Sequence, residues 1–302
     1  TLSKQGDEIV KSPTCYMPVA KTMKKDYPQI EFATYLNISS EDSPLQPESG
    51  GEKIEARMGW TDEDFFKIFA GFTFLEGSAE TAFEKTNSIV LSEKTARKLF
   101  GDNPALGKTL IDDKYTIPLL KGIYTVGGVV RIPEQSHLDF GFLLPGTNSK
   151  FAHSDSWHDK GFVRVYIKLK ENATIDDDFL DAASNHLSRY SDFTDKLMFQ
   201  PLADIHLRSD YPHYMFDKNP GNFRYVWIFS GLAFLIILMA SFNFSVLSVA
   251  RAFEQATEIG VRKVFGAKKK GIFRQFMAES VFQSVVAMVL GLLMVMLVLP
   301  WF

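Results

Sequence analysis

The apolar positions follow two different patterns along the chain. Up to residue 224, apolar residues come in short groups separated by charged and turn-forming residues. After that point two runs contain no charged residue at all, one from Tyr225 to Ala250 and one from Ser280 to Phe302. About 20 helical residues already cross the roughly 30 Å of a bilayer core, whereas apolar runs of about 14 residues or fewer are typical of buried core helices. Both runs are therefore predicted to be transmembrane helices.

The first 224 residues predict a mixed α+β domain with two subdomains. Strands are expected over residues 87–91, 123–131, 138–144, 162–170 and 196–202, and exposed loops over 40–52 and 145–160. Three helices are expected. Thr61 and Asp64 form a capping-box pattern that opens the first, Ser92 and Gly101 bound the second, and Thr174 opens a third that reaches about Tyr190.

The two regions differ in charge. The whole chain has 33 Lys+Arg against 36 Asp+Glu and a net charge of −3, but all the basic residues beyond 224 lie in the short segment 251–279. Short loops rich in Lys and Arg stay on the cytoplasmic side of a membrane. This places 251–279 in the cytoplasm and residues 1–224 outside it.

The sequence begins at Thr1 without an export signal, and it has one cysteine, Cys15. A domain outside the cytoplasm needs such a signal or a preceding anchor helix. We therefore expect the sequence to be a fragment of a longer multi-span chain, with a first span before residue 1 and further spans after Phe302. Cys15 has no second thiol for an internal disulfide or a cysteine metal site.

The basic segment itself has helical character. Residues 254–265 have helical composition, and Gly266, followed by Ala267 and three lysines, is typical of a helix C-cap and turn. A second amphipathic stretch follows, with apolar residues at helical spacing: Ile272, Phe273, Phe276, Met277 and Val281. Charge alone allows two interpretations. The lysines could simply lie near anionic lipid headgroups, or the segment could present a helix to a cytoplasmic partner.

Candidate chemical sites in the first region are weak. A metal site is conceivable on one loop, from His153, Asp155, His158 and Asp159, although such loops are usually only solvated. A second group, His206, Asp210 and His213, is interpreted as a join between domain and membrane. The phenylalanines at positions 65, 66, 69, 72 and 74 are interpreted as core.

Two glycine motifs superficially suggest a nucleotide site. Gly127 and Gly128 lie in a Val-rich strand and lack the following Lys-Ser/Thr, and Gly107-Lys108-Thr109 has Asp102 where a phosphate loop needs glycine. Neither is a phosphate loop, and no Ser-His-Asp or carboxylate arrangement can be argued. We expect no enzyme activity, bound cofactor or nucleic-acid partner for this chain.

The stretch EIGVRKVFGAKKKGIFRQFMAES, residues 258–280, resembles the signature of the FtsX-like permease family of ABC transporters. The likeness includes its position directly after an apolar run with small and polar residues such as Ser241 and Asn243. The chain departs from the usual pattern at Ser241-Phe242. Upstream, the runs from Trp60 to Leu110 and from Tyr124 to Pro145, with Ala203-Asp204-Ile205-His206-Leu207, resemble the MacB-like periplasmic core domain in its Bacteroidetes version.

The resemblance implies a type VII ABC system, in which two permease copies pair and a separate cytoplasmic P-loop ATPase binds ATP and magnesium. Hydrolysis would drive a periplasmic event such as export, lipoprotein release or antimicrobial peptide resistance by mechanotransmission. The resemblance implies a multi-pass protein of the cell inner membrane, with residues 1–224 as a periplasmic domain and 225–302 as the start of the permease domain. In that second domain, helices 225–250 and 280–302 would span the membrane and 251–279 would be the cytoplasmic coupling loop. The residues expected to couple to the ATPase are Glu258, Gly260, Arg262, Lys263, Gly266 and Ala267. The alternative is a membrane-anchored extracytoplasmic binding or sensory protein with no ATPase partner.

Overall fold

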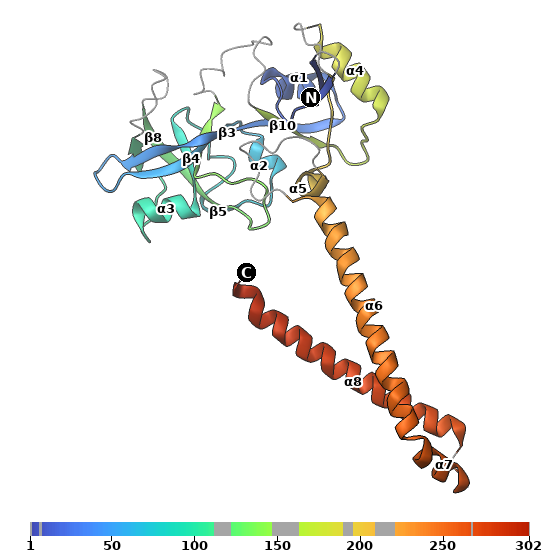
Figure 1. Cartoon of the computed structure of the whole chain (residues 1–302). Coiled ribbons are helices and arrows are strands. Elements are labelled where there is room, and N and C mark those ends of the chain that lie inside the picture. The colour runs from blue at the N-terminus through green and yellow to red at the C-terminus, as the bar shows by residue number, and fades with distance from the viewer. Residues whose placement is uncertain are drawn as a thin grey trace. The chain divides into compact units, whose positions relative to one another are not determined.

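The computed structural model divides the chain into two compact units, Thr1–Phe223 and Arg224–Phe302 (Figure 1). It describes residues 2–5, 8–111, 122–146, 163–189, 196–208, 221–266 and 268–301. The first unit groups as one body, so the expected division of this region into two subdomains is not confirmed.

An eight-stranded mixed sheet organises the first unit. Its strands are β3 (Ile30–Pro47), β4 (Ile54–Thr61), β5 (Thr73–Gly77), β6 (Ser88–Ser92), β7 (Thr109–Ile111), β8 (Ile123–Arg131), β9 (Phe142–Pro145) and β10 (Arg164–Leu169). They run in the order β10-β3-β4-β9-β6-β8-β5, and β7 pairs with both β3 and β8. This last strand closes the ladder β3-β4-β9-β6-β8 into a ring. A separate hairpin joins β1 (Leu2–Gln5) and β2 (Glu8–Lys11).

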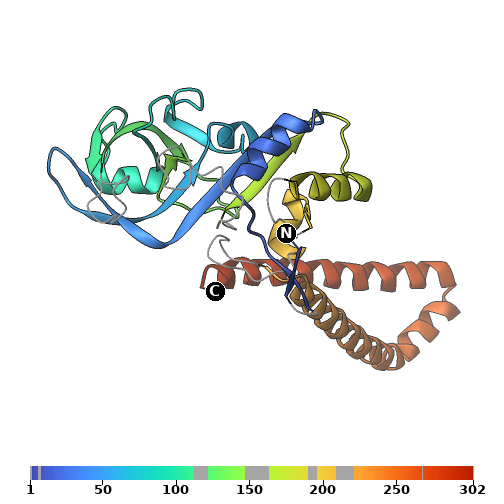
Figure 2. The ribbon, with the colours of Figure 1, turned by 90° about the horizontal axis from the view of Figure 1, so that it is seen from above.

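The ring encloses a hydrophobic cluster because alternate side chains of its strands point inward. Leu45, Met58, Leu110 and Phe142 are almost completely buried there. The helix α3 (Glu93–Phe100) packs on the same cluster through Ala96. Figure 2 shows the strands curling at this end of the unit, with α3 beside them.

A second cluster is rich in phenylalanine and lies around the short helix α2 (Phe65–Ile68). The Phe65 ring centroid lies 4.8 Å from that of Phe69 and 5.6 Å from that of Phe72, and Phe66 lies 4.8 Å from Phe74. The interpretation of these phenylalanines as core is confirmed.

The third cluster brings together residues from near the beginning and near the end of the first unit. Helix α1 (Pro18–Asp26) and helix α4 (Asp177–Leu187) pack on β3 and β10, with Met23 and Leu187 fully buried between them. Figure 2 shows α1 lying along these strands. Cys15 is buried in the same cluster, where its N–H donates to the Val163 carbonyl at 2.7 Å.

Two predicted elements are wrong. Residues 40–47 are not an exposed loop but the second half of β3, and Leu45 in that half is fully buried. Residues 196–202 form no strand. The backbone there is irregular up to a 3-10 turn at Leu202–Asp204, which leads into α5 (Ile205–Arg208). Leu197 nevertheless packs in the third cluster, and its backbone N–H donates to Ser184 Oγ at 2.9 Å. The strand expected from 138 begins only at Phe142.

The expected helix caps have mixed outcomes. Ser92 caps α3, since its Oγ accepts from the Thr95 N–H at 3.3 Å, and Gly101 follows that helix with φ +61°. Thr61 does not cap α2, because it ends β4 and donates its hydroxyl to the Tyr35 carbonyl at 2.7 Å. Asp176, rather than Thr174, caps α4.

The second unit consists of three helices, α6 (Phe223–Glu254), α7 (Ala256–Val264) and α8 (Lys269–Val298), followed by a 3-10 turn at Leu299–Trp301. By length and composition, Phe223–Glu254 and Lys269–Trp301 are long and apolar enough to cross a membrane, with mean hydropathies of 2.3 and 2.6. Most of the segment 251–279 is helical. It contains the end of α6, all of α7 and the start of α8.

Candidate coupling site between the two apolar helices

The last turn of α6 leads into α7 with almost no interruption of the helical backbone. The Gln255 N–H donates to the Arg251 carbonyl at 3.0 Å, and the Ile259 N–H donates to the Gln255 carbonyl at 2.9 Å. Gln255, the one residue between the two helices, has φ −84° and ψ −2° and stays in the right-handed helical region. The chain therefore changes direction here with few backbone groups left unbonded.

Gly266 ends α7 as the sequence predicts. Its φ is +88°, and its N–H donates to the Lys263 carbonyl at 3.0 Å. An added Cβ would meet nothing within 4 Å, so the glycine is required by its backbone conformation rather than by close packing. Lys268 is extended, with φ −74° and ψ 137°, and α8 then starts at Lys269.

Arg262 joins α7 to α8. Its guanidinium donates to Glu258 Oε1 at 2.5 Å within α7 and to Gln275 Oε1 at 3.2 Å on α8. About half of each charged side chain is exposed, so the ion pair contributes at most about 1 kcal/mol. The guanidinium nevertheless links the two helices, and the ion pair joins two of the predicted coupling residues to each other.

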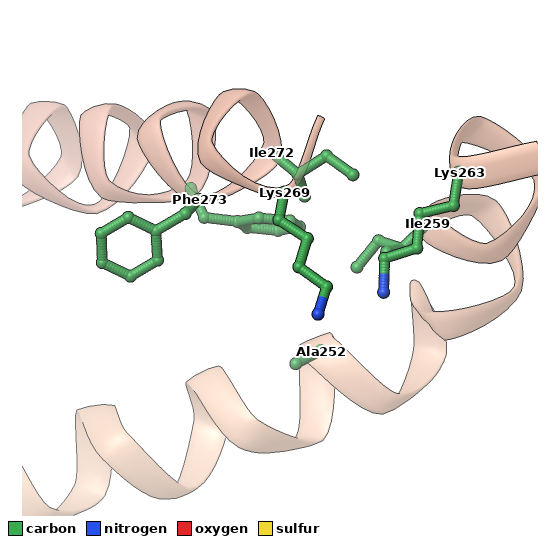
Figure 3. A pocket seen from close by; sticks show the side chains of 7 residues that line it. Ala252, Ile259, Lys263, Lys269, Ile272 and Phe273 are labelled. Atoms are coloured by element: carbon green, nitrogen blue, oxygen red, sulfur yellow. The ribbon is translucent and has the colours of Figure 1, made fainter. Parts of the chain in front are cut away.

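A groove of about 300 Å³ lies between these elements (Figure 3). Its lining comes from α6, α7 and α8, and consists of Ala252, Ile259, Lys263, Lys269, Ile272, Phe273 and Phe276. Of these lining residues, Ile259 on α7 and Ile272 and Phe276 on α8 are half-buried.

Two apolar side chains next to the glycine turn were missed by the sequence analysis. Val264 is 85% exposed and Phe265 is 86% exposed, more than most residues of the apolar runs. The sequence did contain a signal for a binding surface, since these two apolar residues come directly before Gly266. An apolar pair at the end of a helix needs another surface to cover it.

The structure brings most of the predicted coupling residues together on one element. Glu258, Gly260, Arg262 and Lys263 lie on α7, and Gly266 lies in the turn that follows. Ala267 is outside the described residues. Gly260 has open space around it, since an added Cβ would meet nothing within 4 Å.

The weaker candidate sites receive little support. The loop with His153, Asp155, His158 and Asp159 lies outside the described residues, as do Asp210 and His213. Among the residues that the structure describes, no group of three or more His, Cys, Asp or Glu could hold a metal ion. The pair Gly127-Gly128 lies in β8, where a Cβ on Gly127 would come within 2.4 Å of the Ala82 carbonyl oxygen.

One carboxyl group of the sheet unit has an unusual environment. Burial raises the pKa of Asp62 to about 6. Hydrogen bonds from Thr34 Oγ1 at 2.6 Å and from the Asp64 N–H at 3.1 Å lower the pKa, but by less than burial raises it. Asp64 in turn accepts from Lys67 at 3.0 Å and from Lys24. This polar cluster ties α1, α2 and β3 together.

Comparison with known proteins identifies both regions. The family model of the MacB-like periplasmic core domain matches residues 4–178, which is more than half of the chain. The model of the FtsX-like permease C-terminal region matches residues 230–302. The chain belongs to the MacB/FtsX-like family of ABC transporter permeases.

Individual relatives of this MacB/FtsX-like permease are distant in sequence. The macrolide export ATP-binding/permease protein MacB of Pasteurella multocida is 23% identical over 219 residues, which cover 69% of this chain and 29% of that protein. The chain thus spans less than a third of the length of this relative.

One solved structure shows the same fold for the first unit, and a second is only a weaker likeness. A domain of a protein assigned as a permease from Porphyromonas gingivalis, a member of the Bacteroidetes, has a TM-score of 0.51 at 23% identity, covering 61% of this chain and 81% of that one. The periplasmic region of MacB from Actinobacillus actinomycetemcomitans has a TM-score of 0.42 at 18% identity, covering 58% and 74%.

Proposed function

We propose that this chain is the membrane permease subunit of a type VII ABC transporter. A separate cytoplasmic ATPase binds and hydrolyses ATP with magnesium, and this permease passes the movement on to a periplasmic event. That event is export, lipoprotein release or resistance to antimicrobial peptides. The family and the two apolar helices support this function.

The observation that carries the proposal is the helical elbow within residues 251–279, formed by the last turn of α6, by α7 with the turn at Gly266, and by the first turns of α8. α8 runs without a break from Lys269 in this elbow to Val298 at the far end of the apolar run. A continuous helix of 30 residues transmits a displacement of its basic end along about 45 Å. The elbow is therefore suited to receive movement from a partner on the cytoplasmic side.

Each proposed coupling residue has a role that fits its position. Glu258 and Arg262 offer charged groups to the ATPase, Arg262 also links α7 to Gln275 on α8, and Lys263 adds a positive charge to α7. Gly260 leaves room for close approach of the partner, and Gly266 forms the turn. Ala267 follows Gly266 in the sequence and is proposed as part of the same coupling segment. The exposed pair Val264 and Phe265 supplies the apolar part of this docking surface.

The proposed assembly follows from the family and from the charge pattern. Two permease copies pair in the inner membrane, and ATPase subunits bind the elbows from the cytoplasm. In this multi-pass arrangement residues 1–224 form the periplasmic domain, residues 225–250 and 280–302 span the bilayer, and 251–279 is the coupling segment.

The test is affinity purification of the full-length protein from its native membrane, with identification of the proteins that accompany it. We expect an ATPase subunit with the wild type and a strong loss of it with the Glu258→Ala, Arg262→Ala double variant. The matched control is Arg251→Ala, Glu254→Ala, which removes one charge of each sign from the last turn of α6. This control should keep the ATPase.

Two outcomes count against the proposal. Equal loss of the ATPase in both double variants shows that the docking site is not on α7. Absence of any ATPase from intact wild-type protein favours the membrane-anchored binding or sensory protein, in which the basic segment only contacts lipid.

A further inference from the structure

The groove between α6, α7 and α8 starts where the uncharged runs end. Ala252 lies two residues beyond the end of the first run, and Phe276 lies four residues before the second run begins at Ser280. At 1.5 Å per residue these positions are about 3 Å and 6 Å from the ends of the runs. The headgroup layer of a bilayer is about 5 to 8 Å thick on each side. The groove therefore opens at the level of lipid headgroups.

The lining of the groove combines two kinds of surface. One wall is apolar, from Ile259, Ile272, Phe273 and Phe276. The other surface carries two ammonium groups. Lys263 and Lys269 direct their side chains into the space above Ala252 (Figure 3). Within the described part of the chain, neither ammonium group has a carboxylate within 4.0 Å.

We propose that this groove binds one anionic phospholipid of the cytoplasmic leaflet. The phosphate group lies between the ammonium groups of Lys263 and Lys269, and the upper part of an acyl chain packs against Ile272 and Phe273. Basic pockets between membrane helices on the cytoplasmic side are suited to anionic headgroups. The proposal requires α6 and α8 to cross a bilayer, but it does not require an ATPase.

Other occupants match only half of the lining. A water-soluble anion gains nothing from the apolar wall, and an uncharged membrane helix leaves both ammonium groups without a counter-charge. A zwitterionic lipid offers a phosphate but brings its own cation to the same place. An anionic lipid satisfies both surfaces with one molecule.

The groove uses a different face of α7 from the Glu258–Arg262 ion pair. Ile259 and Lys263 are four residues apart and line the groove, whereas Glu258 and Arg262 are paired one position earlier. Bound lipid would therefore hold α7 against α6 and α8 while leaving Glu258 accessible.

The test is native mass spectrometry of the purified full-length protein, exposed to equal amounts of phosphatidylglycerol and phosphatidylcholine with identical acyl chains. We expect the wild type to retain phosphatidylglycerol preferentially. The Lys263→Gln, Lys269→Gln variant should lose this preference by about fivefold per lysine, since each lysine near a membrane surface contributes about 1 kcal/mol. Phe273→Ser should weaken retention of both lipids.

The matched control is Lys268→Gln, Lys270→Gln, which removes the same charge from residues that do not line the groove. This control should retain phosphatidylglycerol as the wild type does. Equal loss in both variants means a diffuse attraction of basic residues to lipid and overturns the proposal. Unchanged retention in Lys263→Gln, Lys269→Gln overturns it as well.

A second arm separates a lipid site from a phosphate site. Glycerol 3-phosphate carries the same phosphate without acyl chains, and at millimolar concentration it should not displace phosphatidylglycerol. Displacement would show a site for free phosphate compounds and overturn the assignment to lipid. Because this assay contains no ATPase, its failure is distinguishable from loss of the ATPase in the purification experiment.

Discussion

The sheet unit and the helical unit use the same apolar residue types for opposite purposes. Phe65 on α2 is fully buried by its own domain, whereas Phe229 on α6 is 65% exposed and Phe265 beside the glycine turn is 86% exposed. The sheet unit completes its own core from residues far apart in sequence. The helical unit presents apolar surface that only a bilayer, other helices or a partner can cover.

The largest expected effect comes from removing the centre of the phenylalanine cluster. Phe65→Ala deletes a fully buried ring that contacts Phe66, Phe69 and Phe72, and should lower the free energy of unfolding of the sheet unit by about 3 to 5 kcal/mol. Urea-dependent proteolysis of the full-length protein measures this. Phe229→Ala on α6 is the control and should leave the same transition unchanged. Similar shifts for both variants would remove the distinction between the two units.

The pH dependence of the sheet unit should report on Asp62. Burial raises the pKa of this carboxyl to about 6, so between about pH 4 and pH 6 the folded state holds a proton that the unfolded state has lost. Stability from this group therefore falls as the pH rises through that window. Asp62→Asn keeps an oxygen that accepts from Thr34 and from the Asp64 N–H, and should gain on the order of 2 kcal/mol at pH 7.

The measurement is the urea midpoint of the full-length protein at several pH values from 4.5 to 7.5. The curves of the wild type and Asp62→Asn should separate as the pH rises and run parallel above about pH 6. Parallel curves over the whole range would mean that Asp62 ionises normally. The helical unit should add little to this difference, because its basic segment is exposed.

The last comparison uses a pair of glycines, one packed against backbone and one in open space. In Gly127→Ala the new Cβ meets the Ala82 carbonyl oxygen at 2.4 Å, a backbone contact that costs about 1 to 3 kcal/mol to relieve. In Gly231→Ala on α6 nothing lies within 4 Å, and the unfolding of the sheet unit should not change. Urea-dependent proteolysis measures both variants. If Gly127→Ala is as stable as the wild type, the turn at Ala82 can move to make room for the added Cβ.

Sequence patterns predicted elements whose signals are local. The two apolar runs and the helix between Ser92 and Gly101 were found because their length or capping residues are visible in a short window. The second half of β3 was missed because its polar residues and prolines resemble a loop. Its strand character depends on pairing with β4 and with β7, which are tertiary contacts.

The candidate site shows the same limit. Charge and glycine spacing pointed to the residues around Glu258 and Gly266, and the turn at Gly266 is confirmed. The groove could not be predicted, since it depends on the approach of Ala252, Ile259 and Phe273 from three helices. The link from Arg262 to Gln275 likewise spans 13 positions and has no local signature.

The length of β3 has a consequence for how the protein is made. This strand emerges early, but residues 30–36 find their partner β10 only at Arg164–Leu169, well over a hundred residues later. Until then its edge stays open, and pairing across such a separation is intrinsically slow. The folding rate of this domain should therefore be limited by the synthesis and pairing of β10. Until β10 pairs, the exposed edge of β3 is the surface that a chaperone would protect most usefully.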